Sequence, residues 1–106
     1  MKEEKIINLE QLGDIRMTAG VFESYQSDID FSFFVDNCLE RYLSGDWGDL
    51  DEDDKKLNNA AILNGDDRIL AAYNFPNPSF TSKDNKIWII TEWDRSVTTI
   101  LFPSEY

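Results

Sequence analysis

The C-terminal stretch constrains the fold most, because two runs of strand-forming residues follow each other across a short polar corner. Residues 86–92 and 96–102 are rich in Ile, Val, Thr, Phe and Trp, which suit a pleated, half-buried surface. Residues 93–96 would form the corner, and Pro103 ends the second strand because it has no N–H to donate. Both faces of the first strand are largely apolar, so we expect this hairpin to lie centrally in a sheet with cover on both sides.

Two helices are predicted ahead of the hairpin. Residues 28–44 carry one apolar stripe at helical spacing, made of Phe31, Phe34, Val35, Cys38, Leu39 and Tyr42. Ser27 and Asp30 have the spacing of a capping box, and Gly45 stands where a left-handed residue would end the helix. In residues 51–64, Asp51 is the expected N-cap. We expect Leu57, Ala60 and Ala61 to face inward and Gly65 to end this helix.

Shorter elements complete the predicted order. Residues 15–18 favour a short strand, residues 19–25 one or two helical turns, and residues 67–75 a strand. Residues 76–85 are too polar and too rich in proline for a strand, which predicts a loop. Helices followed by strands indicate the α+β class: a small antiparallel sheet of about three or four strands, its C-terminal hairpin central, with about two or three helices packed on one face.

Length and cysteine content add limits. The 106 residues predict a single domain, residues 1–106. The one cysteine, Cys38, lies on the apolar stripe, so we expect an inert buried thiol and no internal disulfide. A reducing, cytoplasmic setting fits this cysteine content. No apolar run behind the N-terminus is long enough for a signal peptide or a membrane span.

The charge is strongly acidic and unevenly distributed. The formal net charge is −11, and residues 1–54 hold 15 acidic and 4 basic side chains, whereas the second half is neutral. Such a surface repels nucleic acid and anionic membranes, and it attracts basic protein surfaces at a rate that falls as salt rises. Solubility alone is the simpler explanation.

Several blocks resemble a known bacterial pattern: residues 45–50, 54–55, 58, 68–70, 73, 87–92, 94–99, 103 and 105–106. The chain resembles, over residues 14–106, a family of small proteins common on plasmids and integrative elements and usually described as plasmid-related. Residues 76–85 look like an insertion relative to that pattern, and Trp93 replaces a typically small residue. The resemblance implies a bacterial origin and a mobile-element setting, with no catalytic role to transfer.

The densest group of acidic side chains is the run 46–54, which we take as the candidate partner-binding surface: Asp46, Trp47, Asp49, Asp51, Glu52, Asp53 and Asp54. Helix capping and solvation explain the acids more simply. The alternate acids also resemble the start of a calcium loop, but Asp54 replaces the turn glycine and Ala60 the bidentate glutamate, so no metal is predicted. Trp47 is either a core anchor or an exposed partner anchor, and we favour the core.

A second polar group lies at the hairpin corner, where Glu92, Asp94 and Arg95 cluster. Because the chain has no histidine, it lacks the commonest general base and metal ligand. An ion pair and turn explain the cluster best, and a small carboxylate-based enzyme is the alternative. We predict no cofactor, no direct binding of nucleic acid and no membrane association.

These observations favour a non-enzymatic interaction protein of a mobile element. Its acidic half would meet a basic protein surface, such as that of a host defence or restriction nuclease, by imitating the charge of DNA. The sequence leaves the partner and the oligomeric state open.

Overall fold

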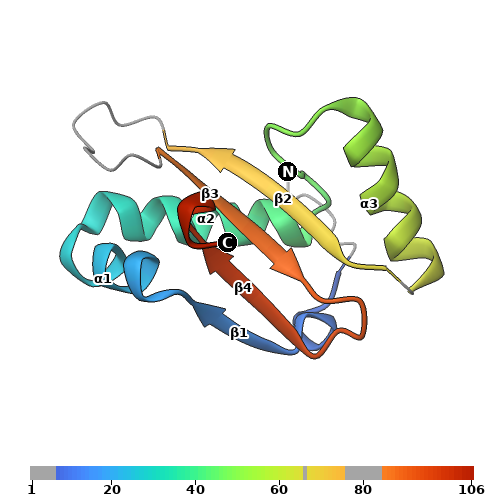
Figure 1. Ribbon diagram of the computed structural model, residues 1–106, viewed down its shortest axis with the longest axis horizontal. Helices are drawn as coiled ribbons and strands as arrows, with labels where there is room; N and C mark the ends of the chain where they lie inside the picture. The colour runs from blue at the N-terminus through green and yellow to red at the C-terminus, as the bar shows by residue number, and fades with distance from the viewer. Residues whose placement is uncertain (1–6, 66, 76–84) are drawn as a thin grey trace.

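The described part of the chain folds into a mixed four-stranded sheet with three α-helices (Figure 1). The computed structural model describes residues 7–65, 67–75 and 85–106. The elements are η1 (Leu9–Leu12), β1 (Asp14–Met17), α1 (Ala19–Ser27), α2 (Ile29–Leu43), α3 (Glu52–Asn64), β2 (Ile69–Asn74), β3 (Lys86–Thr91), β4 (Val97–Leu101) and η2 (Pro103–Glu105). Residues 76–84 of the predicted loop lie outside the described residues.

The strand order is β1-β4-β3-β2, so the C-terminal hairpin occupies the two central positions. β2, β3 and β4 pair antiparallel, and β1 pairs with β4 in parallel. The predicted α+β class and the central hairpin are therefore confirmed. The parallel edge strand was not predicted, and it follows from the connection between β1 and the rest of the sheet, which runs through all three helices.

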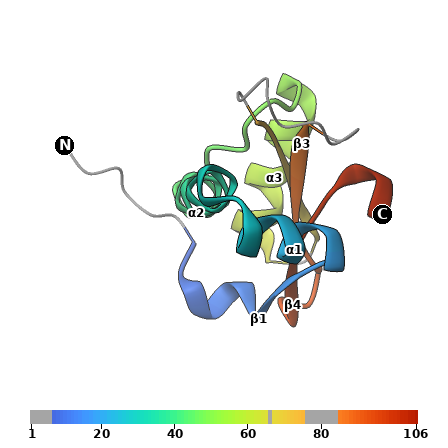
Figure 2. The ribbon, with the colours of Figure 1, turned by 90° about the vertical axis from the view of Figure 1, so that its left-hand side faces the viewer.

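The main core lies between α2 and the sheet. Viewed along the sheet, α2 lies on one side and the C-terminal turn on the other (Figure 2). The predicted stripe of α2 faces the strands. Phe31, in the first turn of this helix, packs 5.5 Å from Phe75 and 5.7 Å from Phe102, measured between ring centroids. Cys38 is fully buried as predicted, and this desolvation raises the pKa of its thiol to about 12.

The helix ends show which sequence signals are used. The cap of α2 is Asp28, whose carboxylate accepts hydrogen bonds from the N–H groups of Asp30 and Phe31. The predicted cap, Ser27, is wrong by one position: it is the last residue of α1, and its hydroxyl bonds back to the Glu23 carbonyl. Gly45 and Gly65 adopt the expected left-handed conformation, and Asp51 caps α3 as predicted.

The inward face of α3 differs from the prediction. Leu57 is 65% exposed and Ala60 is also exposed, whereas Asn58 and Ala61 are buried. The reason is the position of α3 beside the edge strand β2 (Figure 1). There the helix meets unpaired backbone groups as well as apolar side chains: the Asn58 amide donates to the Leu70 carbonyl at 2.6 Å and accepts from the Leu70 N–H at 3.2 Å.

The second face of the sheet is covered by the C-terminal turn. Tyr106 packs edge-on against Trp88, with ring centroids 5.7 Å apart. Glu105 reaches the start of α1, where its carboxylate accepts from the Thr18 hydroxyl at 2.6 Å and from the Gly20 N–H at 3.0 Å. A carboxylate is favoured at this position by the helix dipole. The C-terminal turn is thereby tied to the start of α1.

Candidate functional site

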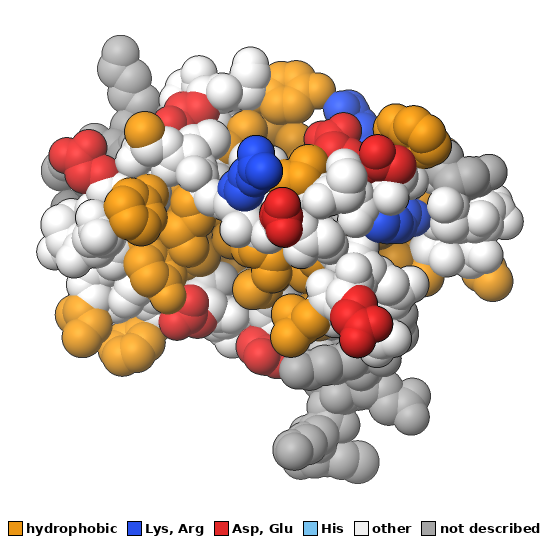
Figure 3. All heavy atoms as spheres, turned by 90° about the horizontal axis from the view of Figure 1, so that it is seen from below, with side chains coloured by type: hydrophobic (Ala, Val, Ile, Leu, Met, Phe, Trp, Pro, Cys, Tyr) orange, Lys and Arg blue, Asp and Glu red, His pale blue; other side chains and the backbone are white. Residues whose placement is uncertain are grey.

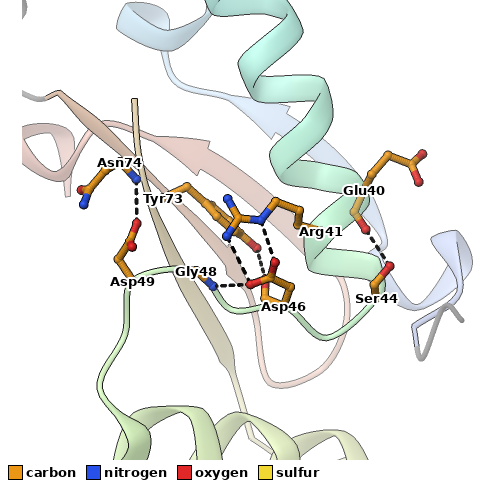
Figure 4. Close-up of polar contacts among 8 residues, drawn as sticks. All are labelled: Glu40, Arg41, Ser44, Asp46, Gly48, Asp49, Tyr73 and Asn74. Atoms are coloured by element: carbon orange, nitrogen blue, oxygen red, sulfur yellow. Dashed lines mark hydrogen bonds and ion pairs between the residues drawn. The ribbon is translucent and has the colours of Figure 1, made fainter. Parts of the chain in front are cut away.

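The loop between α2 and α3 protects the outer edge of β2. Gly48 forms a parallel bridge with Ala72, flanked by hydrogen bonds from the Ala72 N–H to the Trp47 carbonyl and from the Asp49 N–H to the Ala72 carbonyl. The Asp49 carboxylate accepts from the Asn74 N–H at 2.9 Å (Figure 4). Together with Asn58, the loop therefore provides partners for the outward backbone groups of β2. An exposed strand edge would otherwise invite association.

Asp46 holds this loop to α2. Its carboxylate accepts from the Arg41 guanidinium at 2.7 Å and from the Gly48 N–H at 3.0 Å, and its backbone carbonyl accepts from the Tyr73 hydroxyl (Figure 4). The Arg41 guanidinium also lies 4.8 Å above the Tyr73 ring. The hydrogen bond from Arg41 holds the pKa of Asp46 below its usual value. Asp46 is thus neutralised within the chain.

Trp47 belongs to the core, which confirms the favoured interpretation. It is 2% exposed, and its ring meets the Tyr42 ring edge-on at 5.3 Å. Its indole N–H donates to the Asn59 side-chain oxygen at 3.0 Å. The ring is therefore not exposed on the surface. Although Trp47 belongs to the predicted partner-binding set, its contacts hold the loop against the core.

The remaining acids of the run divide between structure and surface. Asp51 accepts from the Asp54 N–H as the cap of α3. Glu52, Asp53 and Asp54 occupy the exposed first turn of that helix, and we call these three residues the α3 acidic turn. Among the described residues, the one ion pair of this turn joins the Glu52 carboxylate to the Lys55 ammonium at 3.6 Å. Carboxylates at this end of a helix interact favourably with its dipole, and the three side chains of the turn are exposed to solvent.

Beside the α3 acidic turn the surface is hollowed by about 250 Å³. The walls combine three leucines, two carboxylates, one amide and one guanidinium: Leu50, Leu57, Leu70, Asp54, Asp67, Asn58 and Arg68. The Arg68 guanidinium donates to the Tyr106 hydroxyl at 2.9 Å. This hollow has no signature in the sequence. No local pattern links residues 50–58 with residues 67–70, which meet only because α3 packs beside β2.

The hairpin corner serves the turn. Asp94 accepts from the Ser96 N–H, and hydrogen bonding with Ser96 holds the pKa of Asp94 below its usual value. Arg95 has a left-handed backbone (φ 61°), and its guanidinium donates to carbonyls of the corner, of Asp67 and of Ala61 in α3. The predicted turn is present, but among the described residues no ion pair joins Glu92 or Asp94 to Arg95; the guanidinium instead donates to the Glu92 carbonyl at 3.2 Å. The hollow described above is not lined by Glu92, Asp94 or Arg95.

Across the described ranges no group of three or more His, Cys, Asp or Glu side chains is placed to hold a metal ion. Within the same residues, no helix combines the length and the apolar character needed to cross a membrane. Comparison with protein-family models, with curated proteins and with solved structures gave no match for this chain. A functional assignment therefore depends on the chemistry of its own surface.

Proposed function

We propose that the protein is a non-enzymatic binding protein that uses the α3 acidic turn and the neighbouring hollow to hold a basic protein surface. The supporting observation is that carboxylates and an exposed leucine line the same surface hollow. Asp54 and Asp67 line the same hollow as Leu57, which is 65% exposed. Lys and Arg side chains combine an aliphatic stem with a cationic head, so this mixture suits their insertion.

Charge favours the same class of partner. The formal net charge of −11 attracts cationic surfaces over several ångströms and repels DNA and anionic lipid. The resemblance to plasmid-related proteins supports a bacterial cytoplasmic setting on a mobile element. In that setting the partner is a DNA-handling host protein, for example a defence or restriction nuclease. The acidic surface would compete with DNA for its cationic groove.

Affinity capture from a bacterial lysate tests this proposal. The immobilised protein is expected to retain a basic, DNA-binding protein at low salt and to release it as salt rises. Added duplex DNA should compete for the captured protein. A triple variant, Glu52→Gln with Asp53→Asn and Asp54→Asn, should lose the capture, because these side chains carry the exposed charge.

The matched control neutralises three exposed carboxylates elsewhere: Glu10→Gln, Glu23→Gln and Asp30→Asn. It changes the net charge by the same amount and should keep the capture. Circular dichroism checks that both triple variants are folded. Recovery of no basic partner, or equal loss in the two triple variants, would count against a specific α3 surface.

A further inference from the structure

The two edge strands of the sheet differ in whether their outward backbone groups have hydrogen-bond partners. β2 is covered by Asn58, by the loop at Gly48 and by the Asp49 carboxylate. Within the part of the chain that the structure describes, β1, the opposite edge, pairs only with β4. Figure 3 views the molecule from below, onto the side where Figure 1 places β1, and there hydrophobic side chains alternate with charged groups of both signs. An edge left open on a sheet whose other edge is covered is a template for strand addition.

The direction of the free backbone groups follows from the pairing. The Asp14 N–H donates to the carbonyl of Ser96, just before β4, and the Thr18 N–H donates to the carbonyl of Ile100 in β4. Since amides alternate along a strand, the N–H and C=O groups of Ile15 and Met17 point away from the sheet. No hydrogen bond to these outward groups occurs among the described residues. Ile15 is also 41% exposed.

We propose that β1 pairs antiparallel with β1 of a second copy of this chain, in the register centred on Ile15. Around this two-fold axis the two Ile15 residues exchange a pair of backbone hydrogen bonds. Asp14 of each copy then lies directly opposite Arg16 of the other. Both side chains are exposed, at 69% for Arg16 and 78% for Asp14, and within one copy they lie only 3.6 Å apart.

Self-complementarity is what selects a second copy as the occupant. Asp14 and Arg16 flank Ile15, whose backbone groups point away from the sheet. A two-fold rotation about Ile15 therefore places each acid opposite the base of the other copy, and a two-fold interface uses the same surface of both copies. A register centred on Arg16 would place two arginines directly opposite, which is destabilising. The pairing also covers Ile15 with Ile15 of the second copy, on the face of the sheet that carries Thr98. A four-residue strand buries little surface, so the dimer belongs to the transient class.

Sedimentation velocity from ~10 µM to ~1 mM protein, the range in which transient interfaces assemble, tests the proposal. We expect a monomer–dimer equilibrium for the natural sequence. Asp14→Arg and Arg16→Asp each convert two attractive pairs into two repulsive ones, and each should weaken the dimer by at least ~10-fold. The double reversal, Asp14→Arg with Arg16→Asp, should restore it. An equimolar mixture of the two single variants should form a heterodimer.

The controls apply the same charge changes at exposed sites away from β1: Glu23→Arg on α1 and Lys56→Asp on α3. Both should associate like the natural sequence. A protein that stays monomeric over the whole range would overturn the proposal. A dimer that ignores both single reversals would also overturn it, because association would then use another surface.

Discussion

At the scale of single residues, a buried row of hydroxyl groups shows how polar side chains are accommodated in this core. The Tyr42 and Thr91 hydroxyls lie 2.8 Å apart, those of Thr91 and Thr98 also 2.8 Å, and the Thr98 hydroxyl donates to the Leu12 carbonyl at 2.7 Å. Each hydroxyl has one proton. Because Thr98 gives its proton to Leu12, Thr91 donates to Thr98. Tyr42 then donates to Thr91 at 2.8 Å, since the Ile69 carbonyl, the other acceptor near the Tyr42 hydroxyl, is more distant at 3.4 Å. The row therefore has one direction, from α2 through two strands to η1.

Replacing Thr98 by valine should break two hydrogen bonds of this row, because Thr98 both accepts from Thr91 and donates to Leu12. The substitution keeps the shape of the side chain but leaves the Leu12 carbonyl without its donor and the Thr91 hydroxyl without its acceptor. We expect a loss of ~1–3 kcal/mol in the free energy of unfolding, measured by urea denaturation. Thr99→Val is the matched control, because Thr99 is half-buried on the other face of β4 and should change stability little. Equal losses in the two variants would mean that the hydroxyl row adds nothing to stability beyond an ordinary strand position.

At the scale of elements, the edge of β2 depends on a close approach of two backbones. Gly48 has φ +76°, and a Cβ at this position would collide with the Ala72 carbonyl oxygen. The loop of residues 45–50 can therefore pack against β2 as a short parallel strand would, because position 48 is a glycine. The sequence reveals the glycine but not the strand that it meets.

Gly48→Ala should therefore lower the free energy of unfolding by more than the strain of a left-handed alanine alone. Gly65 provides the comparison, since its φ is +69° and nothing lies within 4 Å of an added Cβ. We expect Gly65→Ala to lower the free energy of unfolding by ~1 kcal/mol, from left-handed strain alone. Gly48→Ala should lower it by at least ~1 kcal/mol more, because overpacking is added. Thermal denaturation of both variants measures the difference, and equal losses would mean that the loop moves away from β2 at little cost.

At the scale of the whole molecule, acid acts on stability in two opposing ways. Protonating exposed carboxylates relieves the repulsion that accompanies a net charge of −11. Protonating Asp46 removes the bond between α2 and the loop that protects β2. Since the pKa of Asp46 is lowered in the folded state, its contribution is present above the unfolded value of ~3.9 and is lost as the pH falls through the folded value.

The variant Asp46→Asn separates these two effects. At neutral pH we expect it to be less stable than the natural protein by up to ~1 kcal/mol, a modest value because the ion pair is partly exposed. The difference should stay constant down to pH ~4 and shrink below it, where Asp46 itself becomes protonated. Urea denaturation of both proteins across this range measures it. A difference that does not change with pH would show that the charge of Asp46 is not what stabilises the loop.

The sequence by itself determined the elements and most of their buried faces. The apolar stripe of α2, the strand of residues 67–75 and the C-terminal hairpin were predictable, because helical and strand periodicities are local consequences of which side chains must leave water. Ser27 and Leu57 show the limit of that reasoning. Ser27 and Asp28 are both suitable caps for α2, and the structure uses Asp28. On α3, Asn58 faces the backbone of β2, so the neighbouring Leu57 stays exposed.

The tertiary structure alone decided which charged residues remain available. Asp46, Asp49 and Asp51 look equivalent to Asp53 and Asp54 in the sequence, yet the first three hold backbone amides or an arginine and the last two face solvent. The sequence also did not determine the parallel pairing of β1 with β4, which makes β1 an edge strand of the described sheet. Both depend on contacts between segments far apart in the chain, and the free energy of such contacts carries no local signature.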